Sequence, residues 1–396
     1  MTKNVVVCCD GTSNEFKKNR TNVAKLCLTL LQKPGVQEVF YHPGLGTMEP
    51  PGALTSVSVW VTKLLGLAIG YGLKNDIRDA YVFLMNHAEP GDRAFIFGFS
   101  RGAYTARALT GLLHMYGLLR PGNEPLVPYA IRMMFGVNTL PKTAGGKPGR
   151  QSAQDFFQLA AEFKRTFSVA CKPAFVGLWD TVNSVGLMSQ AFHVPYTANN
   201  PDIAVARHAL ALNEVRGFFR PNPWYPKADP AFAAGPKDLM QVWFAGCHSD
   251  VGGGFAEPES GAAKCALEWM IAEAAGHGLL FMPERVREML GAPGPYYAPV
   301  YIKPDPRGRL HNSMTGFWPL LEFVPKKRYD PVTKRWKWRI NLFAWRPVPD
   351  DALVHESVFA RGEAYRKHCR NFPKHPKIVH TKPVPELGIK DPEDGE

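Results

Sequence analysis

The chain has 396 residues, 45% of them hydrophobic, which is enough to bury a large core in one α/β domain with insertions or in two domains. Its net charge of +12 favours an anionic partner, either an acidic lipid surface, a nucleic acid or a phosphate-bearing substrate. Seven cysteines without a C-x-x-C pair argue against a metal site or a disulfide framework, and favour buried thiols in a reducing compartment.

The N-terminal stretch "NVVVCCDGT" predicts a short buried strand. It turns polar after about five apolar residues, so we expect no signal peptide, and a protein that is cytoplasmic or exported without a cleavable signal. The apolar run Val57–Leu73 contains Lys63 and has 17 residues, short of the roughly 20 that cross a bilayer. It predicts a buried helix or a lid over an apolar site, and not a transmembrane segment.

Further strand-like runs follow along the chain, separated by helical segments. The helical spacing is clearest at Ile77, Tyr81 and Leu84. The strand-like runs are "EVFYHPGLGT", "RAFIFGFSRG", "PAFVGLWDTV", "LMQVWFAGCHSDVGGG" and "WKWRINLFAW". This alternation predicts an α/β fold, with a mostly parallel sheet and helices on both faces. Residues 121–150 and 187–238 are rich in Pro, Gly and Asn, and are expected to be lid-like insertions.

Ser100 lies in "GFSRG", which fits the pattern G-x-S-x-G. An apolar strand precedes the pattern, and a helix-forming run with Ala103, Ala106 and Ala108 follows it. A serine at such a strand-to-helix turn has a strained backbone and presents its hydroxyl at the carboxyl end of the sheet. The context favours Ser100 as a nucleophile over a structural turn residue.

A serine nucleophile needs a histidine base and an acid that orients the base, in the chain order Ser, Asp, His. Counting strands after Ser100 selects Asp250 as the acid, after "QVWFAG", and His355 as the base, after "RINLFAW". In α/β-hydrolase arrangements the acid can also follow the strand before that one, which here selects Asp180. Asp180 with His248 is therefore the alternative pair. His311, in "RLHNSMTG", is a further candidate histidine.

An oxyanion hole needs two backbone N–H groups directed at the developing charge. We expect one from Arg101, the residue after the nucleophile, and the other from Gly11 or Thr12 in "CCDGTSN". The neighbouring Asp10 is an acid, a metal ligand or a turn residue that bonds its own backbone. The three glycines of "DVGGGF" do not form a phosphate-binding motif, and no metal is expected.

Residues Val324–Arg339 interleave seven basic residues with Tyr329, Trp336 and Trp338. Such a composition suits the headgroup region of an anionic membrane, although a solvated hairpin with one basic face would look the same. The alternative to an enzyme is a basic module that binds a membrane or a nucleic acid on an inactive scaffold. No nucleic-acid-binding fold accompanies these residues, so we expect no nucleic-acid partner.

The motifs "CDGTSN", "YHPGLGT", "GFSRGAYTAR", "GLWDTV", "WFAGCHSDVGGGF" and "HESVFAR" occur in this order. In these motifs and their order, the chain resembles a group of α/β-hydrolase-like proteins that was formerly of unknown function. This group includes the catalytic domains of type VI secretion phospholipase effectors. The resemblance spans roughly residues 4–365, and implies a catalytic domain over 1–365. Residues 366–396 have many prolines and charges and little periodicity, so we expect an irregular tail there. The resemblance also implies an α/β-hydrolase fold without a cofactor, and cleavage of phospholipid or related acyl esters by Ser100, with Asp250 and His355 as acid and base.

Overall fold

The computed structural model describes residues 2–11, 19–44, 69–140, 149–182, 194–224, 235–295, 300–316, 318–330 and 335–389. One eight-stranded sheet runs through this part of the chain, in the order β12-β11-β8-β7-β6-β3-β1-β2. Every pair of neighbours in it is parallel. Its strands are β1 (Asn4–Cys9), β2 (Gln37–His42), β3 (Arg93–Phe99), β6 (Pro173–Trp179), β7 (Val205–Ala211), β8 (Asp238–Phe244), β11 (Leu353–His355) and β12 (Lys377–Val379).

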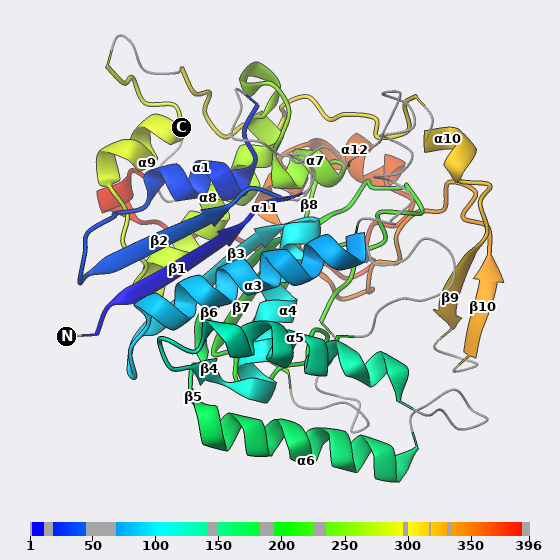
Figure 1. Ribbon diagram of the computed structural model, residues 1–396. Helices are drawn as coiled ribbons and strands as arrows, with labels where there is room; N and C mark the ends of the chain where they lie inside the picture. Colours follow the sequence, from blue (N-terminus) through cyan, green and yellow to red (C-terminus); the bar gives the residue numbers. More distant parts are fainter. Residues whose placement is uncertain are drawn as a thin grey trace, which may run out of the picture.

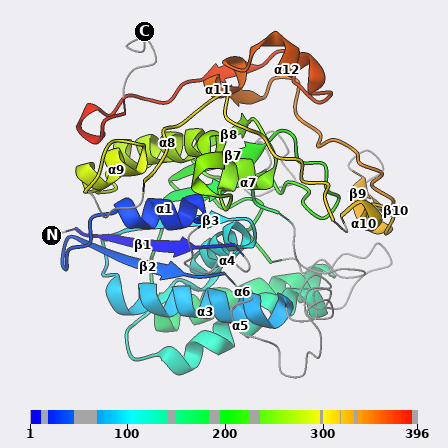
Figure 2. The same cartoon turned by 90° about the horizontal axis from the view of Figure 1, so that it is seen from above.

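Helices cover both faces of the sheet (Figures 1 and 2). On one face lie α3 (Ile69–His87), α4 (Arg101–Tyr116), α5 (Val127–Gly136) and α6 (Arg150–Phe167). The other face carries α1 (Asn22–Thr29), α8 (Gly261–Gly276) and α9 (Pro283–Met289). The parallel α/β architecture predicted from the alternating runs is therefore confirmed.

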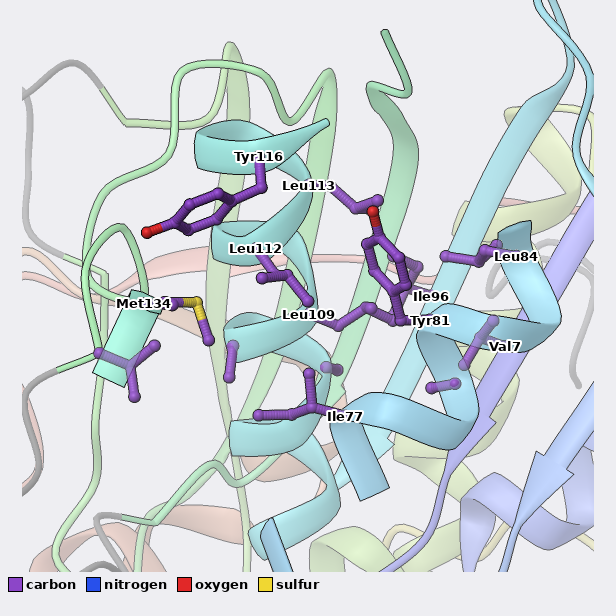
Figure 3. Packing of buried hydrophobic residues seen from close by; sticks show 14 of the residues in the cluster. Val7, Ile77, Tyr81, Leu84, Ile96, Leu109, Leu112, Leu113, Tyr116 and Met134 are labelled. Carbon is purple, nitrogen blue, oxygen red and sulfur yellow. The ribbon is translucent and has the colours of Figure 1, made fainter. Parts of the chain in front are cut away.

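The side chains of β1 point alternately to the two faces of the sheet, and each face has its own hydrophobic core. Val5 and Val7 face the core of α3 and α4, whereas Val6 and Cys8 face the core of α1 and α8. A strand buried on both faces reads as a continuous apolar run, which is the pattern that the sequence shows. Figure 3 shows the first core from close by, with Ile77 and Tyr81 of α3 packed against Leu109 of α4.

Shorter elements complete the fold. They are the paired strands β4 (Leu118–Leu119) and β5 (Ser168–Val169), the ribbon β9 (Lys326–Asp330) and β10 (Arg335–Arg339), the helices α7 (His248–Gly252), α10 (Trp318–Leu321), α11 (Glu356–Phe359) and α12 (Gly362–His368), and the 3₁₀ turns η1 (Glu124–Leu126), η2 (Val137–Thr139), η3 (Glu257–Glu259) and η4 (Pro385–Leu387). None of the helices in the described segments is both long and apolar enough to cross a bilayer.

Three segments differ from the sequence-based expectation. β7 is a central strand inside the predicted insertion 187–238, and β12 is an edge strand inside the predicted irregular tail. The predicted strand "RINLFAW" is not in the main sheet, because the backbone of Leu342 and Phe343 has positive φ and turns there. Of the predicted helix or lid over Val57–Leu73, residues 57–68 lie outside the described part of the chain. Residues 69–73 form the start of α3.

Candidate active site

Ser100 occupies the sharp turn between β3 and α4. Its backbone has φ 58° and ψ −119°, a conformation that residues other than glycine rarely adopt. Its N–H donates to the carbonyl of Trp179 at 3.0 Å. Both glycines of the motif are needed at this turn. A Cβ on Gly98 would lie 2.5 Å from the Gly102 carbonyl oxygen, and one on Gly102 would lie 2.2 Å from that of Cys9. The geometry is that of a nucleophile elbow.

Asp180 and His248 form a buried pair beside this turn. Asp180 follows β6, the strand next to β3, and His248 begins α7 after β8. The Nδ1–H of His248 donates to Asp180 Oδ2 at 2.5 Å, and both side chains are buried. An aspartate in this position fixes the tautomer of the imidazole and leaves Nε2 as its proton-accepting nitrogen.

Two aromatic rings hold the imidazole of His248. The ring of Phe99, the residue before Ser100, stacks on it with centroids 4.6 Å apart, and Phe219 meets it edge-on at 4.8 Å. Burial lowers the pKa of His248 and outweighs the opposing effect of the Asp180 charge. His248 is therefore neutral at pH 7 and able to accept a proton. Among the described residues no hydrogen bond joins His248 Nε2 to Ser100 Oγ, a contact that commonly tightens only when substrate binds.

Arg346 completes the environment of Asp180. Its guanidinium donates two parallel hydrogen bonds to the carboxylate, at 2.6 Å to Oδ1 and 2.9 Å to Oδ2, and the N–H of Ala211 adds a third at 3.0 Å. Burial alone would raise the pKa of Asp180, but Arg346 and His248 together hold it well below its usual range. Asp180 is therefore a fixed anion.

We expect Arg346→Met to destabilise the protein by about 3–5 kcal/mol, because it leaves the buried Asp180 carboxylate with an incomplete set of partners. Urea unfolding monitored by circular dichroism measures this loss. The double variant Asp180→Asn/Arg346→Met removes the uncompensated charge as well, and should recover at least about 1 kcal/mol relative to Arg346→Met alone. Equal unfolding free energies for the two variants would contradict this account of the pair.

Asp250 and His355, the first-choice acid and base of the sequence analysis, bond to other residues and not to each other in the structure. Asp250 accepts hydrogen bonds from the Nδ1 of His311 at 2.7 Å and from the backbone N–H groups of Cys247 and His311. His355 engages Ser357 through Nδ1 at 2.9 Å and Thr381 through Nε2 at 3.0 Å. Four strand steps separate β11 from β3, or about 19 Å at the usual strand spacing.

The candidate oxyanion donors differ in their surroundings. Arg101 is the first residue of α4, where backbone N–H groups have no acceptor within the helix. The N–H of Gly11 donates to the side chain of Asp10 at 2.6 Å, so that donor is already engaged. The Asp10 carboxylate also accepts hydrogen bonds from the hydroxyls of Thr21 and Tyr41. These bonds match the role of a residue that holds its own loop in place. Thr12 lies outside the described residues.

Sequence reasoning missed Arg346 and Phe219, which surround the Asp180–His248 pair. Arg346 is 166 residues from its partner Asp180, in the stretch "FAWRPVP", which matches no motif. Phe219 lies in a segment interpreted as an insertion. The proximity of both residues to the pair depends on tertiary structure that no local pattern encodes.

Comparison with known proteins places residues 3–273 in one family. The matching family model is described as the catalytic domain of Tle1-like phospholipase effectors of the type VI secretion system (T6SS). An uncharacterized protein of Saccharomyces cerevisiae is 36% identical over 241 residues, which cover 57% of this chain and 34% of that protein. The chain thus spans about a third of the length of this curated relative.

Two solved structures are also similar, each at 18% identity. One is an uncharacterized protein from Pseudomonas aeruginosa, with a TM-score of 0.42 over 72% of this chain and 47% of that one. The other is the Tle1 effector bound to the VgrG spike of the type 6 secretion system, with a TM-score of 0.31 over 66% and 53%. The family model covers more than half of the chain, and the chain therefore belongs to the family of T6SS Tle1-like phospholipase effector catalytic domains.

Proposed function

We propose that the protein is a serine hydrolase that cleaves the carboxylic esters of phospholipids or related lipids, with Ser100 as nucleophile, His248 as base and Asp180 as the acid that orients it. The observation that carries this proposal is the elbow geometry of Ser100 next to the buried Asp180–His248 pair. These three residues also fall within the matched region 3–273, whereas His355 lies beyond it. Membership of a phospholipase effector family favours a lipid substrate.

In the proposed reaction Ser100 Oγ attacks the ester carbonyl while His248 Nε2 accepts the hydroxyl proton. The oxyanion that forms accepts a hydrogen bond from the backbone N–H of Arg101, at the positive end of α4. The leaving alcohol takes the proton from His248 as the acyl-enzyme forms. Water, activated by the same imidazole, then releases the fatty acid and restores Ser100. Asp180 stays ionised throughout and stabilises the imidazolium, a role that its lowered pKa supports.

We expect kcat/KM for a soluble ester to be constant near neutral pH and to fall on acidification. Only neutral His248 accepts a proton, and burial places its pKa below the usual 6.5, so the acid limb should have its midpoint below pH 6.5. Initial rates between about pH 4 and pH 8 measure this, with circular dichroism at each pH to confirm that the protein is folded. An acid limb centred above pH 7 would contradict the assignment of His248.

Product analysis in heavy-oxygen water tests the proposed reaction. Phosphatidylglycerol vesicles incubated with the protein should yield lysophospholipid and a fatty acid whose carboxylate carries one heavy oxygen atom, because water cleaves the acyl-enzyme. The matched control is Ser100→Ala, which should release no fatty acid above background. Release of a phosphorylated headgroup without fatty acid would show that a phosphoester bond is cleaved, and would overturn the proposal.

A further inference from the structure

Large apolar side chains are exposed on α10, on β10 and in the segments that follow each of them. These two elements lie with β9 at the right edge of Figure 1. Leu320 and Phe323 lie on the turn that begins with α10, where the N–H of Phe323 donates to the Leu320 carbonyl. The ring of Phe323 contacts that of Phe343 at 6.2 Å. We call the following six residues the apolar patch: Leu320 (65% exposed), Phe323 (56%), Trp338 (54%), Ile340 (47%), Leu342 (58%) and Phe343 (41%).

The turn that carries Leu342 and Phe343 is held in a strained conformation. Both residues have positive φ, 47° and 57°, which is unfavourable for bulky side chains. The buried carboxylate of Glu322 holds the turn, because it accepts from the N–H of Phe343 at 3.1 Å and from the side chain of Asn341. Strain of this kind persists where the surroundings enforce it and is common at ligand-binding sites. The two apolar side chains are therefore displayed by a fixed scaffold.

The ribbon beside the patch is strongly basic. Of the ten residues in β9 and β10, six are Lys or Arg and one is Asp. The register sets Lys337 opposite Arg328 and Arg339 opposite Lys326. Basic residues next to exposed Trp, Leu and Phe suit the interface of an anionic bilayer, where the rings lie at headgroup level.

The segments that carry the apolar patch also supply residues that contact the candidate active site. Four residues after Leu342, Arg346 is paired with Asp180. The rings of Phe219 and Trp318, the first residue of α10, lie 5.2 Å apart, and Phe219 also contacts His248. A lipid surface bound at the patch would therefore lie next to the segments that hold the acid and base.

We propose that the apolar patch and the β9–β10 ribbon dock the protein on an anionic lipid bilayer, with Leu342 and Phe343 inserted at the headgroup boundary. This places the candidate site at the membrane that supplies its substrate, and to that extent it rests on the proposed function. Docking needs both apolar insertion and charge attraction, so we expect binding to anionic vesicles that weakens with salt.

Vesicle co-sedimentation of the Ser100→Ala protein tests the docking without consuming the lipid. Vesicles of phosphatidylcholine with about 30% phosphatidylglycerol should bind the protein, and vesicles of phosphatidylcholine alone should bind it much less. Leu342→Asn/Phe343→Asn should weaken binding at least about tenfold, since asparagine tolerates the positive φ but does not insert. Lys337→Glu/Arg339→Glu should weaken binding to the anionic vesicles in the same way.

Phe157→Gln/Leu159→Gln is the matched control, because it removes two exposed apolar side chains from α6, a helix outside the patch that runs along the bottom of Figure 1. This control variant should bind anionic vesicles as tightly as the parent, which is the Ser100→Ala protein. Unfolding curves should show that all variants are folded. Equal vesicle binding by the parent and Leu342→Asn/Phe343→Asn would overturn the proposal. So would a parent that binds no vesicles, or one that forms dimers which that variant disrupts. Patch-dependent binding by a protein that releases no fatty acid would support the docking and refute only the proposed hydrolysis.

Discussion

Replacing Ser100 with alanine should lower kcat/KM for ester hydrolysis by about 10⁴-fold or more, because no covalent acyl-enzyme can then form. The fold should be unaffected, since the Ser100 backbone N–H still donates to Trp179. Initial rates with a soluble p-nitrophenyl ester measure the effect. Ser357→Ala is a matched control that removes another buried serine hydroxyl, and it should keep most of the activity. A Ser100→Ala enzyme within about tenfold of wild type would refute the nucleophile.

Replacing His248 with glutamine should lower kcat/KM nearly as far, because the proton of Ser100 then has no acceptor. His355→Gln should stay within about tenfold of wild type, since both ring nitrogens of His355 are engaged by Ser357 and Thr381. The double variant Ser100→Ala/His248→Gln should be no slower than either single variant, because residues that act as a unit are not additive. The same ester assay, on protein shown to be folded by circular dichroism, compares all of these variants.

The opposite ranking, with His355→Gln inactive and His248→Gln active, would contradict the assignment of the base. It would favour the set Ser100, Asp250 and His355, and would require the roughly 19 Å between β3 and β11 to be bridged by a rearrangement. Equal losses in both histidine variants, with normal unfolding curves, would also contradict the assignment.

The elbow at Ser100 was predictable because its causes are local. An apolar strand, two glycines and a helix-forming run lie within a few residues of each other, and each glycine is required by a backbone contact at this turn. The parallel sheet was predictable for a similar reason, since strands such as β1 are buried over their whole length and apolar after the first residue, Asn4.

The count of strands after Ser100 omitted β7, which lies between β6 and β8 in the sheet. That count was the basis for preferring Asp250 with His355 over Asp180 with His248. "VARHALA" contains Arg207 and His208, which a buried strand normally excludes. Arg207 is tolerated because Glu273 and Asp238 neutralise it, at 2.5 and 2.8 Å, and both partners are distant in the sequence. A count that includes β7 no longer points to Asp250.

The second error concerned the strand before His355. The apolar run "RINLFAW" satisfies the pattern of a strand, but the buried Glu322 holds its middle in a turn with positive φ. Propensity is a weak guide where tertiary hydrogen bonds dictate the backbone. The pairing of Asp180 with His248 and Arg346 depends on contacts of the same long-range kind.

Labelling with a fluorophosphonate tests the central claim most directly, because this probe reacts much faster with a serine whose proton a base removes than with an ordinary hydroxyl. Peptide mass spectrometry should place the label on Ser100 in the wild-type protein and in His355→Gln, and should find none in His248→Gln. Label on another residue, or labelling of His248→Gln at the wild-type rate, would contradict the proposed set of Ser100, His248 and Asp180.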